Sequence, residues 1–173
     1  MSPKISIIGS SIRDNRWKKF YENLKNTNEI DFEIVFCGNA VPIWELPSNF
    51  SYIYSETKPA QCVEISARHA KGELLMVSSD DLVFGDNFLD NLYAHYDENC
   101  TNYDFVSARF RRRGYEYTPE DFRFWTSVDS SPLMPMNITL KREIWHEIGG
   151  IDKNFIGLFY DLDLALRLME RGG

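Results

Sequence analysis

GELLMVSSDDLVF, residues 72–84, decides how the rest of the sequence is interpreted. Its four consecutive apolar residues, 74–77, run into two serines and then into Asp80 and Asp81, which predicts a buried strand that ends at carboxylates. In open α/β sheets, ligands bind beyond the carboxyl ends of the strands. Two carboxylates there suit a hard cation such as Mg²⁺ or Mn²⁺, because oxygen ligands match it and leave room for phosphate oxygens. In the alternative interpretation, the two acids only cap the turn before the next helix.

The segments before this stretch predict a parallel α/β arrangement. Residues 4–9 and 32–37 are short apolar runs typical of buried strands, and residues 15–26 between them predict an amphipathic helix. The core-facing side of that helix carries Trp17, Phe20, Tyr21 and Leu24. Strand, helix and strand in succession begin a parallel βαβ unit. Residues 52–54 predict another short strand, and residues 59–71 predict a helix that delivers the chain into the acid-ended strand.

The segments after the stretch continue the alternation. Their patterns predict a helix over 86–97, strands over 104–110 and 136–140, and helices over 141–148 and 161–170. Asp161 and Asp163 fall in the first turn of the last helix, where the helix dipole favours acids whatever their function. Residues 111–135 contain prolines and aromatic residues without clear periodicity, which predicts a lid or a binding loop.

The composition predicts one packed domain over residues 1–173, an α/β fold with a mostly parallel central sheet flanked by helices. Of the 173 residues 43% are hydrophobic and 14% aromatic, which argues against disorder. No stretch reaches the roughly 18 apolar residues of a transmembrane segment, and no signal segment opens the chain, so a cytoplasmic protein is expected. Cys37, Cys62 and Cys100 are an odd number at wide spacing with no CxxC pair, so they indicate neither a disulfide framework nor a zinc site.

The charge pattern disfavours nucleic acid as a partner. The formal net charge is -7, whereas proteins that wrap nucleic acid present a basic surface. One local exception is an arginine-rich stretch, 109–113, interleaved with aromatic residues up to Tyr117. It can pair phosphates and stack on a base or sugar ring, or it can be a solvated loop that offsets the acidic surplus.

Four segments, in this order, resemble the nucleotide-sugar-dependent glycosyltransferases of family 2, which have the GT-A fold. ISIIGSSIR, residues 5–13, resembles the opening strand and loop with its arginine, and AKGELLMVSSDDLVF, residues 70–84, resembles the segment with the DxD motif. REIWHEIGGID, residues 142–152, is similar to the segment with the family's double glycine. FYDLDLALRL, residues 159–168, is similar to the segment that carries the catalytic base in inverting members. The resemblance covers nearly the whole chain.

The resemblance implies a role for individual residues. Asp81 matches the metal-binding acid of DxD, with Mn²⁺ or Mg²⁺ as the expected cofactor, and Asp161 matches the general base. Gly149 and Gly150 match the loop that shapes the acceptor pocket. The residues expected to bind the nucleotide-sugar and its metal are Ser10, Arg13, Asn39, Ser79, Asp80 and Asp81.

The implied function is metal-dependent, inverting transfer of a sugar from a nucleotide-diphosphate sugar, with a UDP-sugar expected, to a hydroxyl of a glycan or another acceptor. Asp161, at a helix start, would take the acceptor proton on the face opposite the leaving group, and the helix dipole there favours a low pKa. The alternative is a non-catalytic nucleotide-sugar or glycan-binding domain with the same fold. It is motivated by Ser79 and Tyr160, which stand where the family has acids, and by the end of the chain at Gly173, which fits a minimal enzyme or a fragment.

Overall fold

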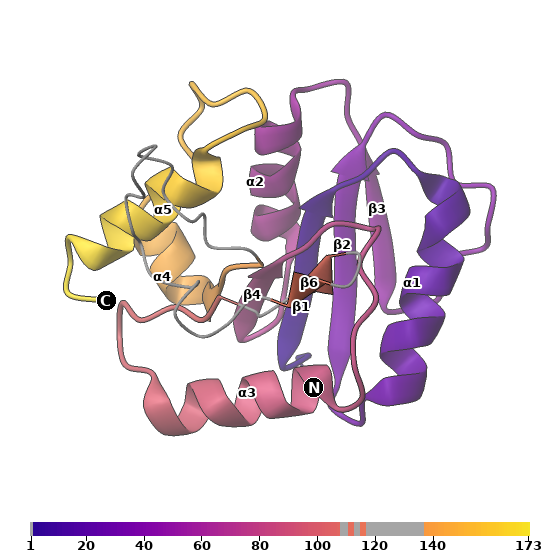
Figure 1. The fold of residues 1–173 in the computed structure, drawn as a ribbon. Helices are drawn as coiled ribbons and strands as arrows, with labels where there is room; N and C mark the ends of the chain where they lie inside the picture. The colour runs from indigo at the N-terminus through magenta and orange to yellow at the C-terminus, as the bar shows by residue number, and fades with distance from the viewer. Residues whose placement is uncertain (1, 108–110, 113–114, 117–136) are drawn as a thin grey trace.

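Five strands form the central sheet in the computed structural model of the chain, which describes residues 2–107, 111–112, 115–116 and 137–173. The strand order is β3-β2-β1-β4-β7. Figure 1 shows β3, β2, β1 and β4 side by side in this order. Four strands are parallel and β7 runs antiparallel to β4. The strands are β1 (Ile5–Ser10), β2 (Phe32–Gly38), β3 (Phe50–Tyr54), β4 (Leu74–Val77) and β7 (Thr139–Lys141). The predicted α/β fold with a mostly parallel sheet is therefore confirmed.

Helices cover both faces of this sheet (Figure 1). The helices α1 (Asp14–Thr27) and α3 (Phe88–Asn99) pack on one face. The helices α2 (Pro59–His69), α4 (Arg142–Glu147) and α5 (Tyr160–Met169) pack on the other face. A separate two-stranded pairing joins β5 (Arg111–Arg112) to β6 (Tyr115–Glu116). None of the helices in the described ranges has the length and apolar character of a membrane span.

The strand β4 is buried on both sides, as its sequence predicts. Leu74 and Met76 contribute to the core under α1 and α3, whereas Leu75 and Val77 contribute to the core under α2, α4 and α5. This division follows from the two-residue period of a strand, which points successive side chains to opposite faces. Both faces must be apolar because helices cover both, and the acids can therefore begin only where the strand ends.

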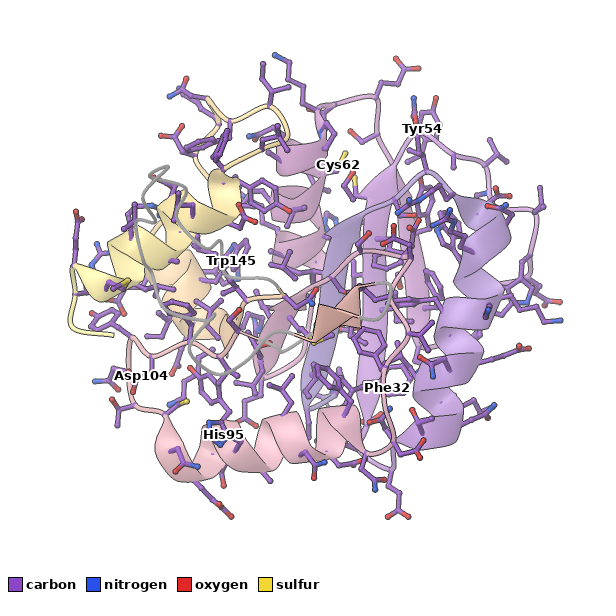
Figure 2. The ribbon with its side chains drawn as sticks, in the orientation of Figure 1. Phe32, Tyr54, Cys62, His95, Asp104 and Trp145 are labelled. Atoms are coloured by element: carbon purple, nitrogen blue, oxygen red, sulfur yellow. The ribbon has the colours of Figure 1, made fainter. Side chains whose placement is uncertain are left out.

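The predicted core-facing side of α1 is also confirmed. Trp17 is fully buried and its ring centroid lies 4.5 Å from that of Tyr52 and 5.8 Å from that of Phe50. Trp145 of α4 is likewise fully buried on the opposite face, whereas Tyr54 and His95 lie on the surface (Figure 2). The aromatic residues thus stabilise both layers by burying large apolar areas.

The strand predicted over 104–110 is wrong in its described part. Residues 104–107 form no strand, and only an isolated bridge joins Val106 to Thr139. The reason is local: the Asp104 carboxylate accepts hydrogen bonds from the amide and hydroxyl of Thr101, which closes a turn where extended pairing was expected. Residues 108–110 lie outside the described part of the chain. Most of the predicted lid over 111–135 and most of the arginine-rich stretch with its aromatic residues also lie outside the described part.

Candidate functional site

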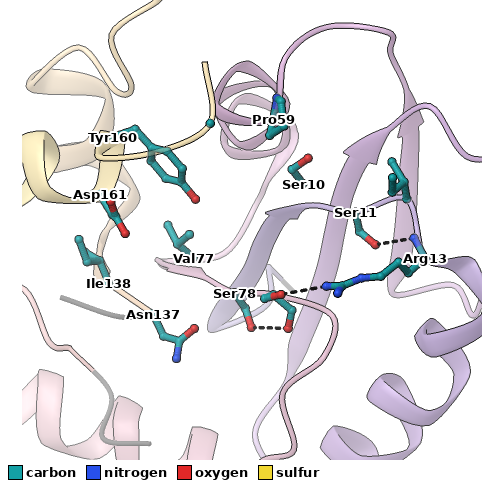
Figure 3. A pocket seen from close by; sticks show the side chains of 13 residues that line it. Ser10, Ser11, Arg13, Pro59, Val77, Ser78, Asn137, Ile138, Tyr160 and Asp161 are labelled. Carbon is teal, nitrogen blue, oxygen red and sulfur yellow. Dashed lines mark hydrogen bonds between the residues drawn. The ribbon is translucent and has the colours of Figure 1, made fainter. Parts of the chain in front are cut away.

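A cavity of about 480 Å³ opens at the carboxyl ends of β1 and β4 (Figure 3). One wall comes from the end of β1 and from the loops after β1 and β4, which contribute Ser10, Arg13 and Ser79 among others. The opposite wall comes from the start of α5, which contributes Tyr160 and Asp161. The cavity therefore lies where ligands bind in open α/β sheets, and segments far apart in the sequence build it.

Asp80 is buried beneath the first wall and connects its two loops. Its carboxylate accepts a hydrogen bond from the Ser11 hydroxyl and forms an ion pair with the Arg13 guanidinium. The same Ser11 oxygen accepts a hydrogen bond from the Trp17 indole at 2.6 Å. These contacts hold the loop after β1 against the loop after β4. Because the Asp80 side chain is fully inaccessible, it cannot contact a ligand in this arrangement.

Asp81 lies beside the cavity with its side chain 42% exposed. Its Oδ1 accepts a hydrogen bond from the Ser79 hydroxyl at 2.5 Å, and its Oδ2 lies 3.2 Å from Arg13 Nη1 and 3.5 Å from Arg16 Nη1. The Ser79 hydrogen bond and the Arg13 charge hold the pKa of Asp81 below its ordinary value, although partial burial opposes them. Asp81 is therefore a carboxylate at neutral pH.

The surroundings of Asp161 shift its pKa in the direction opposite to that of Asp81. Burial raises the pKa of its half-buried carboxyl above the ordinary value, and the Leu162 amide, which donates a hydrogen bond at 3.0 Å, lowers it only in part. The expectation that the helix dipole gives Asp161 a low pKa is therefore wrong, because desolvation outweighs the helix start. Beside it, burial and the Asp161 charge raise the pKa of Tyr160 to about 12, so Tyr160 keeps its proton.

A left-handed residue stands immediately before the two cavity residues Tyr160 and Asp161. Phe159, immediately before α5, has φ of 65°, which a non-glycine residue adopts at an energetic cost. Figure 3 shows Tyr160 and Asp161 on the same side of the cavity, facing the wall that carries Ser10 and Arg13. Left-handed strain of this kind concentrates at functional sites, and here it fixes the entry of α5.

The loop that leads to α5 is fastened to α2 by a buried carboxylate. Glu64 Oε2 accepts hydrogen bonds from the Trp145 indole and from the Ile151 amide, both at 3.0 Å. Further along, the Ala60 amide donates to the Ile156 carbonyl at 3.1 Å. Arg167 of α5 donates to the Gly150 carbonyl at 2.6 Å. These contacts fix where α5 begins and hence where Asp161 lies.

The structure brings most of the expected site residues together. Ser10, Arg13, Ser79 and Asp161 line the cavity. Asp80 and Asp81 do not line it, but both contact Arg13, which does. Two expectations fall elsewhere: Asn39 is exposed after β2 and is not part of the cavity lining, and Gly149 and Gly150 form the turn after α4 rather than a wall of the cavity.

Sequence reasoning missed three residues that shape the site. Ser11 and Arg16 complete the contacts of the two acids, and Glu64 fastens the loop before α5. Arg16 could have been noticed because it lies one helical turn from Arg13. Glu64 could have been noticed because it stands on the apolar face of α2, four residues after Ala60 and three before Ala67.

The oxygen ligands of the site fit a divalent cation that arrives with phosphate. Within the described ranges, no three His, Cys, Asp or Glu side chains cluster as a metal site. Mg²⁺ and Mn²⁺ do not need such a cage, since one or two carboxylates with substrate phosphates and water suffice. Asp81, with the Ser79 hydroxyl beside it, is an accessible carboxylate of this kind next to the cavity.

Comparison with known proteins finds similar solved structures. No protein-family model and no curated protein sequence matches the chain. S. aureus TarS 1-349 in complex with UDP-GlcNAc is similar over 95% of this chain, with a TM-score of 0.69 and 14% identity. The mannosyltransferase PcManGT from Pyrobaculum calidifontis, in complex with GDP-Man and Mn²⁺, is similar over 99% of this chain, with a TM-score of 0.67 and 16% identity.

The two similar structures are about twice as long as this chain. The match spans 54% of the TarS chain and 53% of the PcManGT chain. In each case the match covers nearly all of the present sequence. At this level of identity the likeness concerns the fold, and the chain has the GT-A fold of these glycosyltransferases.

Proposed function

We propose that the chain is a glycosyltransferase domain of the family 2 type, which moves a sugar from a nucleotide-diphosphate sugar to an acceptor hydroxyl with inversion. The observation that carries the proposal is the arrangement of one cavity between Arg13, with its two aspartates, and Asp161. The similar structures that hold UDP-GlcNAc or GDP-Man support a nucleotide-sugar as the donor, and we propose a UDP-sugar first.

The wall formed after β1 and β4 suits the donor diphosphate. Arg13 offers a planar guanidinium, which binds phosphate oxygens in pairs, and the hydroxyls of Ser10 and Ser79 add hydrogen-bond donors. A Mn²⁺ or Mg²⁺ ion held by Asp81 would supply Lewis-acid stabilisation of the negative charge on the leaving diphosphate. Asn39, at the carboxyl end of β2, presents an amide that can both donate to and accept from a nucleobase.

The wall formed by α5 suits the acceptor. Asp161 can take the proton from the acceptor hydroxyl, and its raised pKa makes it a stronger base than an ordinary aspartate. Tyr160 presents a neutral hydroxyl to the same cavity, which can orient the acceptor by a hydrogen bond. With its proton taken by a base that faces the donor wall, the acceptor oxygen would attack the anomeric carbon from the side opposite the diphosphate. The bond to the acceptor oxygen forms as the bond to the diphosphate breaks, and the product would have inverted configuration.

The proposal is tested by nucleotide release from a panel of nucleotide sugars with Mn²⁺. The wild type should release one nucleotide, and Asp161→Asn should lower the rate by about 10²- to 10⁴-fold, the usual contribution of a general base. Asp163→Asn is the matched control, because Asp163 lies in the same helical turn and pairs with Arg167, away from the cavity lining.

Two results would contradict the proposal. If the wild type binds a nucleotide sugar without releasing nucleotide, the non-catalytic binding domain is the better assignment. If Asp161→Asn releases nucleotide at the wild-type rate, as the Asp163→Asn control should, the base lies elsewhere.

A further inference from the structure

Arg13 and Arg16 hold the two aspartates of the site in a cluster with balanced charge. Arg13 pairs with both Asp80 and Asp81, and Arg16 pairs with Asp81 alone. Arg13 also donates to the Ser79 hydroxyl at 3.2 Å, and that hydroxyl donates to Asp81. Two guanidinium groups thus face two carboxylates.

This cluster leaves little electrostatic attraction for a cation alone or for a phosphate alone. A free cation that approaches Asp81 meets two guanidinium groups at Oδ2 and a hydrogen-bonded Oδ1. A free phosphate meets arginines whose charge the aspartates already balance. Each ligand alone would have to break an ion pair and leave a charged partner behind, which costs free energy in a partly desolvated site.

Resting on the proposed donor site, we infer that Arg16 is a further diphosphate-binding residue, which with Arg13 exchanges Asp81 for the diphosphate. When a divalent cation binds Asp81, both arginines lose that partner and bind the diphosphate instead. The exchange keeps the charges paired, because the two ligands bring opposite charges.

The positions of the side chains permit this exchange. Arg13 and Arg16 are 40% and 46% exposed in their side chains, and Asp81 is 42% exposed, so all three can change partners. Asp80 is fully buried and is also held by Ser11, so it stays in place and keeps one anchor for Arg13. The movable contacts are therefore those of Asp81.

The inference is tested by titration calorimetry with MnCl₂ alone, with UDP, GDP, CDP and ADP each alone, and with each nucleotide at saturating MnCl₂. In the wild type, Mn²⁺ should tighten nucleotide binding by about tenfold or more, within the usual range of coupling between sites, and the nucleotide should tighten Mn²⁺ binding by the same factor. Arg16→Gln should bind Mn²⁺ alone more tightly, since one guanidinium is gone, and should bind the nucleotide more weakly.

Lys18→Gln is the matched control for Arg16→Gln. Lys18 lies on the same helix with its side chain 63% exposed and pairs with Glu22, so its removal should leave both affinities and their coupling unchanged. A nucleotide that binds equally well with and without Mn²⁺ would overturn the exchange and leave the proposed nucleotide site standing. If none of the four nucleotides binds under either condition, the proposed function fails and the exchange fails with it.

Discussion

Asp81 and Asp161 are two aspartates beside one cavity whose surroundings move their pKa values in opposite directions. A hydrogen bond from Ser79 and the charge of Arg13 lower the pKa of Asp81, whereas burial raises the pKa of Asp161. Such a division is how one site obtains a permanent anion and a proton acceptor from the same residue type. It fits a metal-binding role for Asp81 and a base role for Asp161.

The raised pKa of Asp161 predicts a shifted acid limb in the pH profile. A general base must be ionised, so nucleotide release should fall as the pH drops through the pKa of Asp161. We expect the midpoint of this fall in kcat to lie above about 3.9, the ordinary value for aspartate. Asp163→Asn should keep the midpoint, and a wild-type midpoint at or below about 3.9 would contradict this role.

The raised pKa of Asp161 also predicts that its carboxylate lowers the stability of the fold at neutral pH. Because its pKa is higher in the folded protein than in the unfolded chain, unfolding releases a proton and stability falls as the pH rises through this window. Asp161→Asn should therefore melt at the same temperature as the wild type or higher at pH 7, while losing activity. A clear decrease in Tm at pH 7, measured by circular dichroism, would show that the carboxylate stabilises the fold.

Asp80 and Asp81 should differ in their contributions to stability. Asp80→Ala removes the buried partner of Ser11 and Arg13, which should lower the free energy of unfolding by about 1–3 kcal/mol. Asp81→Ala changes a half-exposed carboxylate, and its effect should stay within about 0.5 kcal/mol. Urea unfolding of the two variants measures the difference, and equal losses would argue against the buried linking role of Asp80.

At the scale of elements, α2 determines where α5 begins. Its Glu64 fastens the segment after the double glycine, and its Ala60 amide binds the same segment further along. Gly149 and Gly150 have φ of 87° and 63°, which lets the chain turn sharply from α4 towards this anchor. The position of the candidate base therefore depends on a helix that contributes no acid to the cavity.

The two glycines of this turn should tolerate substitution differently. Gly149→Ala adds a methyl group in open space and costs only the left-handed backbone strain, about 1–2 kcal/mol. Gly150→Ala also drives its methyl group into the Glu64 carboxylate, so we expect a loss of about 3 kcal/mol or more. Urea unfolding of both variants measures the contrast. Equal losses would mean that Glu64 moves away freely.

At the scale of the whole molecule, a ligand that binds only the folded state should raise the melting temperature. At 100 times its Kd, a nucleotide with Mn²⁺ would contribute about 2.7 kcal/mol. For a domain of this size, that corresponds to an increase in Tm of about 5 to 10 °C. The increase in Tm should disappear in Asp81→Asn. If this variant keeps the full increase, Asp81 does not take part in binding the nucleotide and Mn²⁺.

Much of the fold could be predicted because its patterns are local. The apolar run of β4, the helical spacing of Trp17 and Phe20 in α1 and the proline that starts α2 each act within a few residues. The strand predicted over 104–110 failed because a short turn at Asp104 competes with extended pairing, and an alternating pattern does not reveal such a turn.

The sequence by itself determined where most strands and helices lie along the chain, the burial of β4 on both sides and the placement of acids where that strand ends. Only the tertiary structure decided which arginines pair with Asp81, that Asp80 is buried, and that burial raises the pKa of Asp161. The physical reason is that burial and ion pairing depend on neighbours distant in sequence. Arg13 and Asp81 are 68 residues apart, and Glu64 and Ile151 are 87 residues apart, and folding alone brings them together.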